Sequence, residues 1–323
     1  MPTTRSPRHG SMQYWPRKRA RRIYPRCRSW PEIDETKPLG FYGYKVEMLH
    51  AIVLDNRLKS RTKGEKIAMP ITLIECPPLN IYSIRLYKQT DHGLKAAKEI
   101  VVSNDKLLAR KIPVAKELKQ ELSRIDITEF DDLRLIVYTS THQTPRGQKT
   151  PEMFELALGG SLQNKFEFAK QHIGKQLRVS DVFAEGEQVD VAGVTKGKGF
   201  QGTVKRFGVG IKQHKSEKTK RGAGNLGAWT PSHVLPTVPQ PGKMGFHTRT
   251  EKNKWLVKIS NEPINPVGGF NHYGPVKNEY ILLKGSVPGP PKRLIRLYKA
   301  KRPSKRYPTE PPQIESISLV TEK

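Results

Sequence analysis

The segment from Gly197 to Val204 reads GKGFQGTV, which has the residue spacing of two phosphate-binding motifs. It matches G-x-G-x-x-G-x-V, the glycine-rich loop of protein kinases, and it contains the G-x-G-x-x-G of dinucleotide-binding folds. Glycine has no Cβ, so backbone N–H groups around Gly197, Gly199 and Gly202 can approach a phosphate closely. The spacing therefore indicates phosphate chemistry, supplied by a nucleotide or by another carrier of phosphates.

The residues around this motif argue against a nucleotide. A kinase loop is followed by V-A-I-K, H-R-D and D-F-G elements, and none of them occurs in the sequence. A dinucleotide fingerprint needs a helix at the last glycines and an acid about 20 residues further on. After Gly202 the sequence TVKRFGVGIKQHK predicts no amphipathic helix, and the nearest acid, Glu217, is isolated. G-K-[ST] is also absent, so the segment is no P-loop.

Cations surround the same glycines. Lys196, Lys198, Lys205 and Arg206 bracket the motif. This arrangement suits many phosphates along a nucleic-acid backbone rather than one triphosphate. The alternative is a glycine-rich turn whose lysines are only solvated.

The charge of the whole chain points to a polyanionic partner. The 323 residues include 58 Lys and Arg against 30 Asp and Glu, which gives a net charge of +28 and a pI of about 10.1. Residues 1–31 hold nine basic residues and no acid, residues 193–258 hold 14 and 2, and residues 284–306 hold nine and none, whereas residues 80–192 are almost balanced. Nucleic acid is the expected partner, with an anionic membrane surface as the alternative. The sequence contains no run of 18 or more apolar residues, so it predicts no membrane-spanning helix.

The first basic segment predicts an RNA-binding arm. It contains the block Arg17-Lys18-Arg19-Ala20-Arg21-Arg22 with Tyr14, Trp15, Tyr24 and Trp30 interspersed. Alone it cannot bury enough apolar surface to fold. We expect it to order against RNA, with guanidinium groups on phosphates and aromatic rings stacked on bases. A disordered basic tail or a nuclear-import patch is the alternative.

Residues 208–247 predict an extension that leaves the folded domain. Their first half is cationic and their second half is rich in Gly and Pro, and forty residues without clear secondary structure would be anomalous in a compact domain. Trp229 has no apolar periodicity around it, so we expect a tip residue that packs on RNA rather than a core residue. His233 could bind a phosphate or base, or be a plain loop histidine.

Short β-branched runs are scattered along the chain between Gly/Pro turns. They are YKVEML, NIYSIRLYK, EQVDVAGV, KWLVKIS, EYILLKGSV, RLIRLYKA and SISLV. The first places Tyr44, Val46 and Met48 on one face, and the second does so for Tyr82, Ile84 and Leu86. The pattern favours a mainly β fold with an antiparallel β-barrel core.

Residues 90–175 differ from the rest and predict an α/β insertion. PVAKELKQELSRI, which covers residues 113–125, has apolar residues at helical spacing. SLQNKFEFAKQHIG predicts a second helix, with Ser161 as its N-cap and Gly174 as its C-terminal stop.

Nothing in the sequence predicts catalysis or a metal site. Cys27 and Cys76 are isolated and fit a reducing, cytosolic setting. The N-terminus is basic but lacks the apolar region of a secretory signal. The nine histidines and the acids are dispersed, so we expect no enzyme.

Three segments together resemble one family. VDVAGVTKGKGFQGTVKRFG, followed by GNLGAWTPSHV and GKMGFHTRT, closely resembles the large-subunit ribosomal protein L-three family. The N-terminal PRHGSMQYWPRKRA resembles its archaeal and eukaryotic cytosolic members, and the shorter length suggests an archaeal source. The sequence departs from eukaryotic members at Lys220-Arg221-Gly222, where they carry a histidine before the R-G pair.

The resemblance implies a fold and a function. Members have a translation-factor-like barrel core and long extensions that penetrate the rRNA. The finger's tryptophan, here Trp229, lies near the peptidyl transferase centre. The family acts early in subunit assembly and binds rRNA near the 3′ end of the large-subunit molecule.

We therefore expect a structural protein of the large ribosomal subunit in the cytoplasm. Its partners would be 23S-type rRNA and neighbouring large-subunit proteins, with no membrane or small-molecule substrate. No cofactor is expected, apart from Mg²⁺ or monovalent ions that could accompany the rRNA. The alternatives are a nucleotide-using enzyme and a DNA-binding regulator, although no helix-turn-helix, zinc module or basic zipper can be placed.

Four regions are predicted: a basic arm (1–40), the barrel core (41–89 with 176–207 and 259–323), the insertion (90–175) and a finger (208–258). The expected rRNA-binding residues are Arg17, Lys18, Arg19, Arg21, Arg22, Lys196, Lys198, Lys205, Arg206, Lys212, Lys215, Lys218, Lys220, Arg221, Trp229, His233, Lys243 and Arg249, with Gly197, Gly199 and Gly202 allowing close approach to phosphate.

Overall fold

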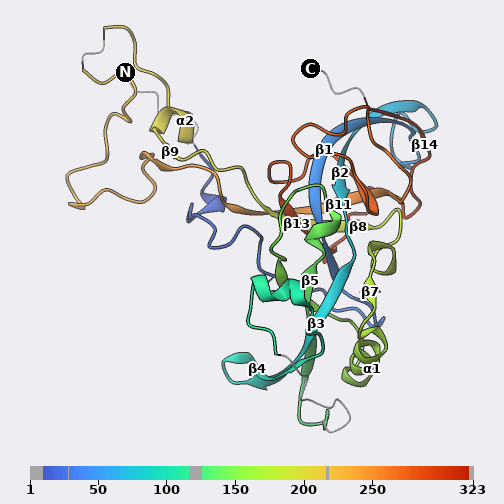
Figure 1. Ribbon diagram of the computed structural model, residues 1–323. Coiled ribbons are helices and arrows are strands. Elements are labelled where there is room, and N and C mark those ends of the chain that lie inside the picture. Colours follow the sequence, from blue (N-terminus) through green and yellow to red (C-terminus); the bar gives the residue numbers. More distant parts are fainter. Residues whose placement is uncertain (1–9, 28, 116–125, 216–217, 320–323) are drawn as a thin grey trace. The chain divides into compact units, whose positions relative to one another are not determined.

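The computed structural model describes residues 10–27, 29–115, 126–215 and 218–319 (Figure 1). The chain divides into two compact units. Unit 1 comprises Met1–Ile23 and Val194–Arg249, and unit 2 comprises Tyr24–Gly193 and Thr250–Lys323. Unit 2 holds most of the strands, so the chain is mainly β, as the sequence predicts.

The larger sheet of unit 2 has seven strands in the order β13-β8-β11-β12-β2-β1-β14. These strands are β1 (Gly40–Leu54), β2 (Lys66–Glu75), β8 (Gln188–Val194), β11 (Thr248–Ser260), β12 (Tyr280–Lys284), β13 (Leu294–Lys299) and β14 (Ile314–Ser318). β1 also pairs with β13 in antiparallel register, from Gly40 opposite Tyr298 to Tyr44 opposite Leu294. The series of pairings therefore returns to the strand from which it began.

The burial of side chains along β1 follows the predicted alternation of faces only in part. Tyr44 and Val46 are fully buried, but Met48 is 43% exposed, and burial resumes at Leu49. The register with β2 shifts between Lys45 and Met48, which marks a bulge. An extra residue at a bulge moves every later side chain to the opposite face. The prediction that Met48 shares a face with Tyr44 is therefore wrong.

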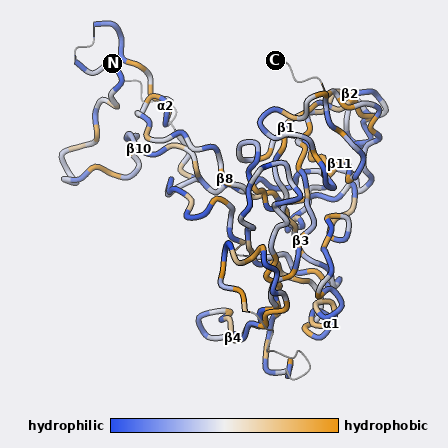
Figure 2. The backbone as a smooth tube through the Cα atoms, in the orientation of Figure 1, coloured by the Kyte–Doolittle hydropathy of each residue, from blue (hydrophilic) through white to orange (hydrophobic). Residues whose placement is uncertain are grey.

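A second sheet in unit 2 has the order β4-β3-β5-β6, with β7 also paired to β3. Its strands are β3 (Leu79–Thr90), β4 (Gly93–Val101), β5 (Asp132–Thr139), β6 (Met153–Ala157) and β7 (Gln176–Leu177). Of the three residues predicted to share one face of β3, Ile84 and Leu86 are fully buried and Tyr82 is half-buried. Hydrophobic stretches of the chain coincide with strands such as β1 and β3 (Figure 2).

The predicted boundary at residue 89 falls at the end of β3, a strand that pairs with the insertion's strands rather than with those of the larger sheet. The two sheets are nevertheless packed into one core, which contains Tyr44, Ile84 and Leu135. The division into four regions stays a prediction.

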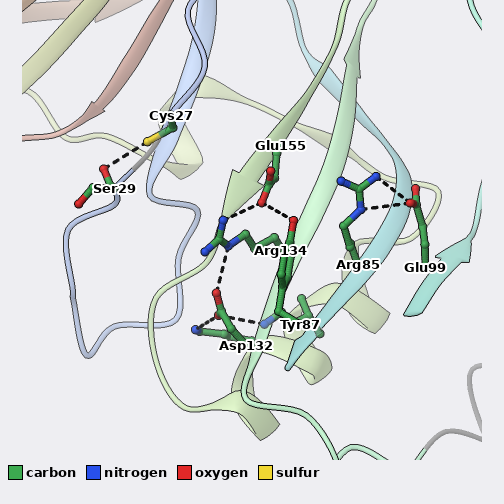
Figure 3. A network of polar contacts seen from close by, with 10 residues as sticks. Cys27, Ser29, Arg85, Tyr87, Glu99, Asp132, Arg134 and Glu155 are labelled. Carbon is green, nitrogen blue, oxygen red and sulfur yellow. Dashed lines mark hydrogen bonds and ion pairs between the residues drawn. The ribbon is translucent and has the colours of Figure 1, made fainter. Parts of the chain in front are cut away.

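A polar network stabilises the second sheet (Figure 3). Arg134 donates to Asp132 at 3.0 Å and to Glu155 at 2.8 Å, and Glu155 also accepts from Tyr87 Oη at 2.8 Å. Lys165 of the helix α1 (Leu162–His172) adds a 2.7 Å bond to Asp132. Arg134 of this sheet and Lys165 beside it are thus neutralised within the protein.

The helix α1 confirms one sequence prediction. Ser161 accepts from the backbone N–H of Asn164, Phe166 and Ala169 are buried, and Gly174 follows with φ +76°. The other predicted helix, in residues 113–125, lies mostly outside the described residues. Short 3-10 helices also occur at η2 (Lys106–Arg110), η4 (Thr141–Gln143) and η5 (Val179–Asp181).

Unit 1 has little regular structure. Its elements are η1 (Met12–Tyr14), the two-residue strands β9 (Phe200–Gln201) and β10 (Gly242–Lys243), and α2 (Thr203–Phe207). The sequence predicted no helix after Gly202, whereas five residues there form α2, which Gly208 ends in a left-handed conformation. Residues 208–215 and 218–241 contain no helix or strand, as expected of an extension.

Candidate nucleic-acid interface

Charge is distributed unequally between the two units. Unit 1 holds 18 of the 58 Lys and Arg residues but only one of the 30 acids, Glu217. Every ion pair between described residues lies in unit 2. Apart from Arg17, the described cations of unit 1 therefore have no carboxylate partner among the described residues, and their mutual repulsion favours binding of a polyanion.

The glycine-rich segment runs beside a second segment from about fifty residues later. Thr195 N donates to His247 O at 3.0 Å, Lys198 N to Met244 O at 3.0 Å, and Met244 N to Gly199 O at 2.9 Å. Gly245 makes this approach feasible, because it has φ +72° and a Cβ there would lie 2.1 Å from the Lys196 carbonyl oxygen. These contacts hold the motif and the GKMGFH segment side by side.

Two of the three glycines of the motif face open space. A Cβ on Gly199 or Gly202 would meet nothing within 4 Å, and one on Gly197 would make only ordinary contact with Phe246. Gly199 has φ +67°, which favours glycine for backbone reasons. Packing within the chain therefore does not require glycine at 197 or 202, and the space beside them is available to a ligand.

The N-terminal arm packs on the same structure. Ala20 N donates to Phe246 O at 2.8 Å, and the ring of His247, which is 8% exposed, lies 2.8 Å through Nδ1 from Lys18 O. A carbonyl oxygen only accepts, so this contact requires the proton of His247 on Nδ1. The arm is thus ordered by contacts within the protein, which the sequence did not predict.

Arm and motif together enclose a pocket of about 350 Å³. Among the described residues, it is lined by six of the cations predicted to bind RNA and by no carboxylate. The lining cations are Arg17, Lys196, Lys198, Arg206, Lys243 and Arg249, accompanied by Thr195, Met244, Gly245 and His247.

Aromatic rings and carbonyl groups hold the guanidinium groups of this pocket. The Phe207 ring lies 4.8 Å from the guanidinium of Arg17 and 5.0 Å from that of Arg206. Arg206 also donates from Nη1 to Gln240 O at 2.8 Å and from Nε to Lys243 O at 3.2 Å. Such neutral partners orient the guanidinium groups without removing their charge.

The other predicted residues lie apart from the pocket on exposed positions. They are Lys18, Arg19, Arg21, Arg22, Lys205, Lys212, Lys215, Lys218, Lys220, Arg221 and His233. Trp229 is 95% exposed, so the alternative that it is a core residue is wrong. An indole left in solvent this completely is suited to stacking on a partner.

Two aromatic residues of the predicted arm pack on unit 2 instead. Tyr24 donates from its hydroxyl to Met153 O at 2.8 Å, and its ring meets Phe154 edge-on. The Trp30 ring lies 4.3 Å from the guanidinium of the buried Arg296. Each of these two rings thus has a packing partner within unit 2, and their stacking on bases stays a prediction.

We also searched the described residues for reactive thiols, metal ligands and membrane-spanning helices. Cys27 and Cys76 are free thiols, and burial raises the pKa of Cys76. No group of His, Cys, Asp and Glu in the described part of the chain could hold a metal ion. Within those same residues, no helix has the length and apolar character needed to cross a membrane.

Comparisons with known proteins agree with one another. The family model described as "Ribosomal protein L3" matches residues 1–319. The "Large ribosomal subunit protein uL3" of Methanothermobacter thermautotrophicus is 43% identical over 330 residues, covering 98% of each chain. Proteins with the same name from Nanoarchaeum equitans and Picrophilus torridus are 45% and 44% identical, covering 98% and 99% of this chain and 96% and 97% of their own length.

Proposed function

The chain belongs to the ribosomal protein L3 family, a family of ribosomal proteins and not of enzymes, and we propose that it binds large-subunit rRNA through unit 1. In this proposal it is a structural constituent of the large ribosomal subunit in the cytoplasm. Its partners are 23S-type rRNA and neighbouring large-subunit proteins. No cofactor is part of the proposal, and Mg²⁺ or monovalent ions would come with the rRNA.

The observation that carries this proposal is the excess of cations in unit 1, which has 18 Lys and Arg residues and one acid. A folded protein that keeps many Lys and Arg residues together without carboxylates is destabilised by their repulsion. Phosphates relieve that repulsion and release the counterions condensed on the RNA. The exposed lysines along residues 208–220 would each meet a backbone phosphate, while the arm and motif would bind at the base of the finger.

The two units have different roles in this proposal. The larger sheet of unit 2 would form a translation-factor-like barrel, which the pairing of β1 with both β2 and β13 supports. Unit 2 pairs part of its charge internally, and in this proposal it would serve as the folded body of the protein rather than as the main RNA-binding surface. The finger would carry Trp229 toward the peptidyl transferase centre, consistent with its almost complete exposure.

Salt titration of binding tests this assignment. We would measure the affinity of the full chain for a fragment from the 3′ end of large-subunit rRNA at several salt concentrations, with duplex DNA as competitor. Each phosphate contact contributes about 0.7–0.9 to the slope of log affinity against log salt. Changing four lysines to Gln should therefore reduce the magnitude of this slope by about 3; they are Lys196, Lys198, Lys212 and Lys215.

The control variant has the same change of charge in unit 2. The side chains to change are exposed and make no ion pair with any described residue, so their change to Gln should leave the slope almost unaltered; they are Lys59, Lys63, Lys95 and Lys98. Equal slopes for the two variants, or duplex DNA that competes as well as rRNA, would contradict the proposed function.

A further inference from the structure

Unit 2 contains a pocket of its own, with a volume of about 970 Å³. Its lining comes from residues 29–34, from residues 157–165 around the start of α1, from residues 131–134 at the start of β5, and from Gln89 and Leu94 near the turn between β3 and β4. Since a water molecule occupies about 30 Å³ of liquid, this volume corresponds to roughly thirty waters. The pocket therefore has room for several residues of a peptide rather than for one side chain.

Backbone hydrogen bonds hold the segment that contains residues 29–34 against the start of α1. Gly160 N donates to Ile33 O at 2.9 Å, and Gly159 N donates to Lys37 O at 3.0 Å. A Cβ on Gly159 would lie 2.3 Å from Glu35 O, so a larger residue there would push the two segments apart. The pocket is therefore formed by the folded chain itself, without a ligand.

The charge of the lining is opposite in sign to that of the whole chain. Four acids and two cations line the pocket, although the chain carries a net charge of +28. The two cations are Arg134 and Lys165, which bond to Asp132 at 3.0 and 2.7 Å. Arg134 also bonds to Glu155 at 2.8 Å (Figure 3). These two cations and two carboxylates cancel one another.

Three carboxylates of the lining are left over. Glu32 and Asp34 are exposed, and neither forms an ion pair with a described residue. Asp131 likewise has no cation beside it in the described part of the chain, and it accepts from Gln89 N at 2.6 Å, which fixes its position. Carboxylates repel phosphates and attract cations. The pocket is therefore unsuited to RNA and suited to a positively charged partner.

The lining also offers apolar surface. It includes Trp30, Leu39, Leu158 and Leu94, of which Leu94 is 43% exposed. A Lys or Arg side chain packs its aliphatic stem on such surface while its charged head reaches a carboxylate. An apolar residue of the same segment would cover Leu94. A peptide with both kinds of side chain thus complements the charge and the apolar part of the pocket together.

We propose that this pocket docks a basic peptide segment of another protein, several residues long and carrying Lys or Arg together with apolar residues. Its place in the large subunit rests on the proposed function, and the segment then belongs to a neighbouring large-subunit protein. Unit 1 and this pocket of unit 2 then take partners of opposite charge, rRNA and a basic segment.

Two short peptides are the probes for the pocket itself. They are KLKLK and its uncharged counterpart QLQLQ, each acetylated and amidated at its ends. We would titrate both into the full chain by calorimetry at about 0.15 M salt, where charges act over only about 8 Å and the net charge of the chain has little influence. Wild-type protein should bind KLKLK about ten-fold or more tightly than QLQLQ, because two or three ion pairs add up to that difference.

A double variant removes the two exposed carboxylates. Glu32→Gln with Asp34→Asn should lower the affinity for KLKLK by about five-fold or more. The matched control is Glu65→Gln with Glu310→Gln, which changes the charge equally at exposed acids outside the pocket that form no ion pair with a described residue. The control should lose less than about two-fold. Equal losses in the two variants, or equal wild-type affinities for KLKLK and QLQLQ, would overturn the proposal.

A photoreactive benzoylphenylalanine in place of Leu94 identifies the occupant in assembled large subunits. Irradiation should join it to a peptide of another protein that contains Lys or Arg, identified by mass spectrometry. Cross-links to RNA alone, or to no other molecule, would overturn the docking of a protein segment while rRNA binding by unit 1 stands. Equal salt slopes in the titration of the unit 1 lysines would instead overturn the proposed function, and binding of KLKLK by the pocket would stand.

Discussion

Replacing Trp229 by Ala tests whether the finger carries function without contributing to the fold. Trp229 is 95% exposed and lies in a segment without helix or strand. Trp255, by contrast, is 1% exposed, donates from Nε1 to Gly186 O at 3.0 Å and stacks on Tyr307. The two tryptophans therefore form a matched pair for the same substitution.

The structure gives different magnitudes for the two changes. Trp229→Ala removes almost no buried surface, so the free energy of unfolding should change by no more than about 0.5 kcal/mol. Trp255→Ala leaves a cavity and an unpaired carbonyl, which should cost about 3–5 kcal/mol. If the Trp229 ring stacks on a base in the assembled subunit, Trp229→Ala should remove about 1–3 kcal/mol of stacking free energy.

The assay has two parts. Denaturant unfolding of the isolated proteins measures their free energies of unfolding. Function is measured with ribosomes in which every copy of this protein carries Trp229→Ala. We expect slower peptide-bond formation or an altered response to a drug directed at the peptidyl transferase centre. A loss of stability above about 1 kcal/mol in Trp229→Ala would show that the ring supports the fold. Wild-type translation by ribosomes shown to contain the variant would refute a role for the finger.

Three further predictions concern the arm, the finger and a loop of unit 2. Limited proteolysis should cleave residues 208–241 before the strands of unit 2, since that segment has no helix or strand; simultaneous cleavage would contradict this. His247→Ala should remove the contact with Lys18 O and make the arm more sensitive to trypsin at Arg21 and Arg22, with no change for unit 2; unaltered cleavage of the arm would contradict the contact. The Arg57 guanidinium beside Asp55 holds the pKa of that carboxyl well below its ordinary range. This stabilisation is complete above the unfolded pKa of about 3.9 and is lost as the pH falls. Asp55→Asn should therefore cost about 1–3 kcal/mol at pH 7 and much less in acid, as measured by unfolding at both pH values; a pH-independent difference would contradict this ion pair.

Local rules predicted seven of the strands and the helix α1 because the relevant signals lie next to one another in sequence. The seven are β1, β3, β8, β11, β12, β13 and β14, whereas β2, β4, β5 and β6 were not predicted. Ser161, the apolar spacing around Phe166 and Gly174 mark both ends of α1 and its buried face. The same rules failed at Met48, since a bulge depends on how β1 pairs with β2 and not on the alternation of β1 alone.

The candidate site was predicted as a set of cations but not as a pocket. Composition identified Lys198 and Lys243 separately, yet their proximity depends on the pairing of β9 with β10, forty residues apart. His247 and Phe207 were missed because their roles arise from contacts with the arm. The alternation of charge along the chain predicted where the RNA would bind, while tertiary contacts decided which cations act together.

Cross-linking of the protein to rRNA within assembled large subunits tests the central claim most directly. Subunits irradiated to join protein to RNA would be digested, and the peptides carrying nucleotides would be identified by mass spectrometry. The account predicts that cross-linked residues fall mainly in residues 10–23 and 194–249, with Trp229 among them. Cross-links concentrated on the strands of unit 2, with none in those two ranges, would contradict it.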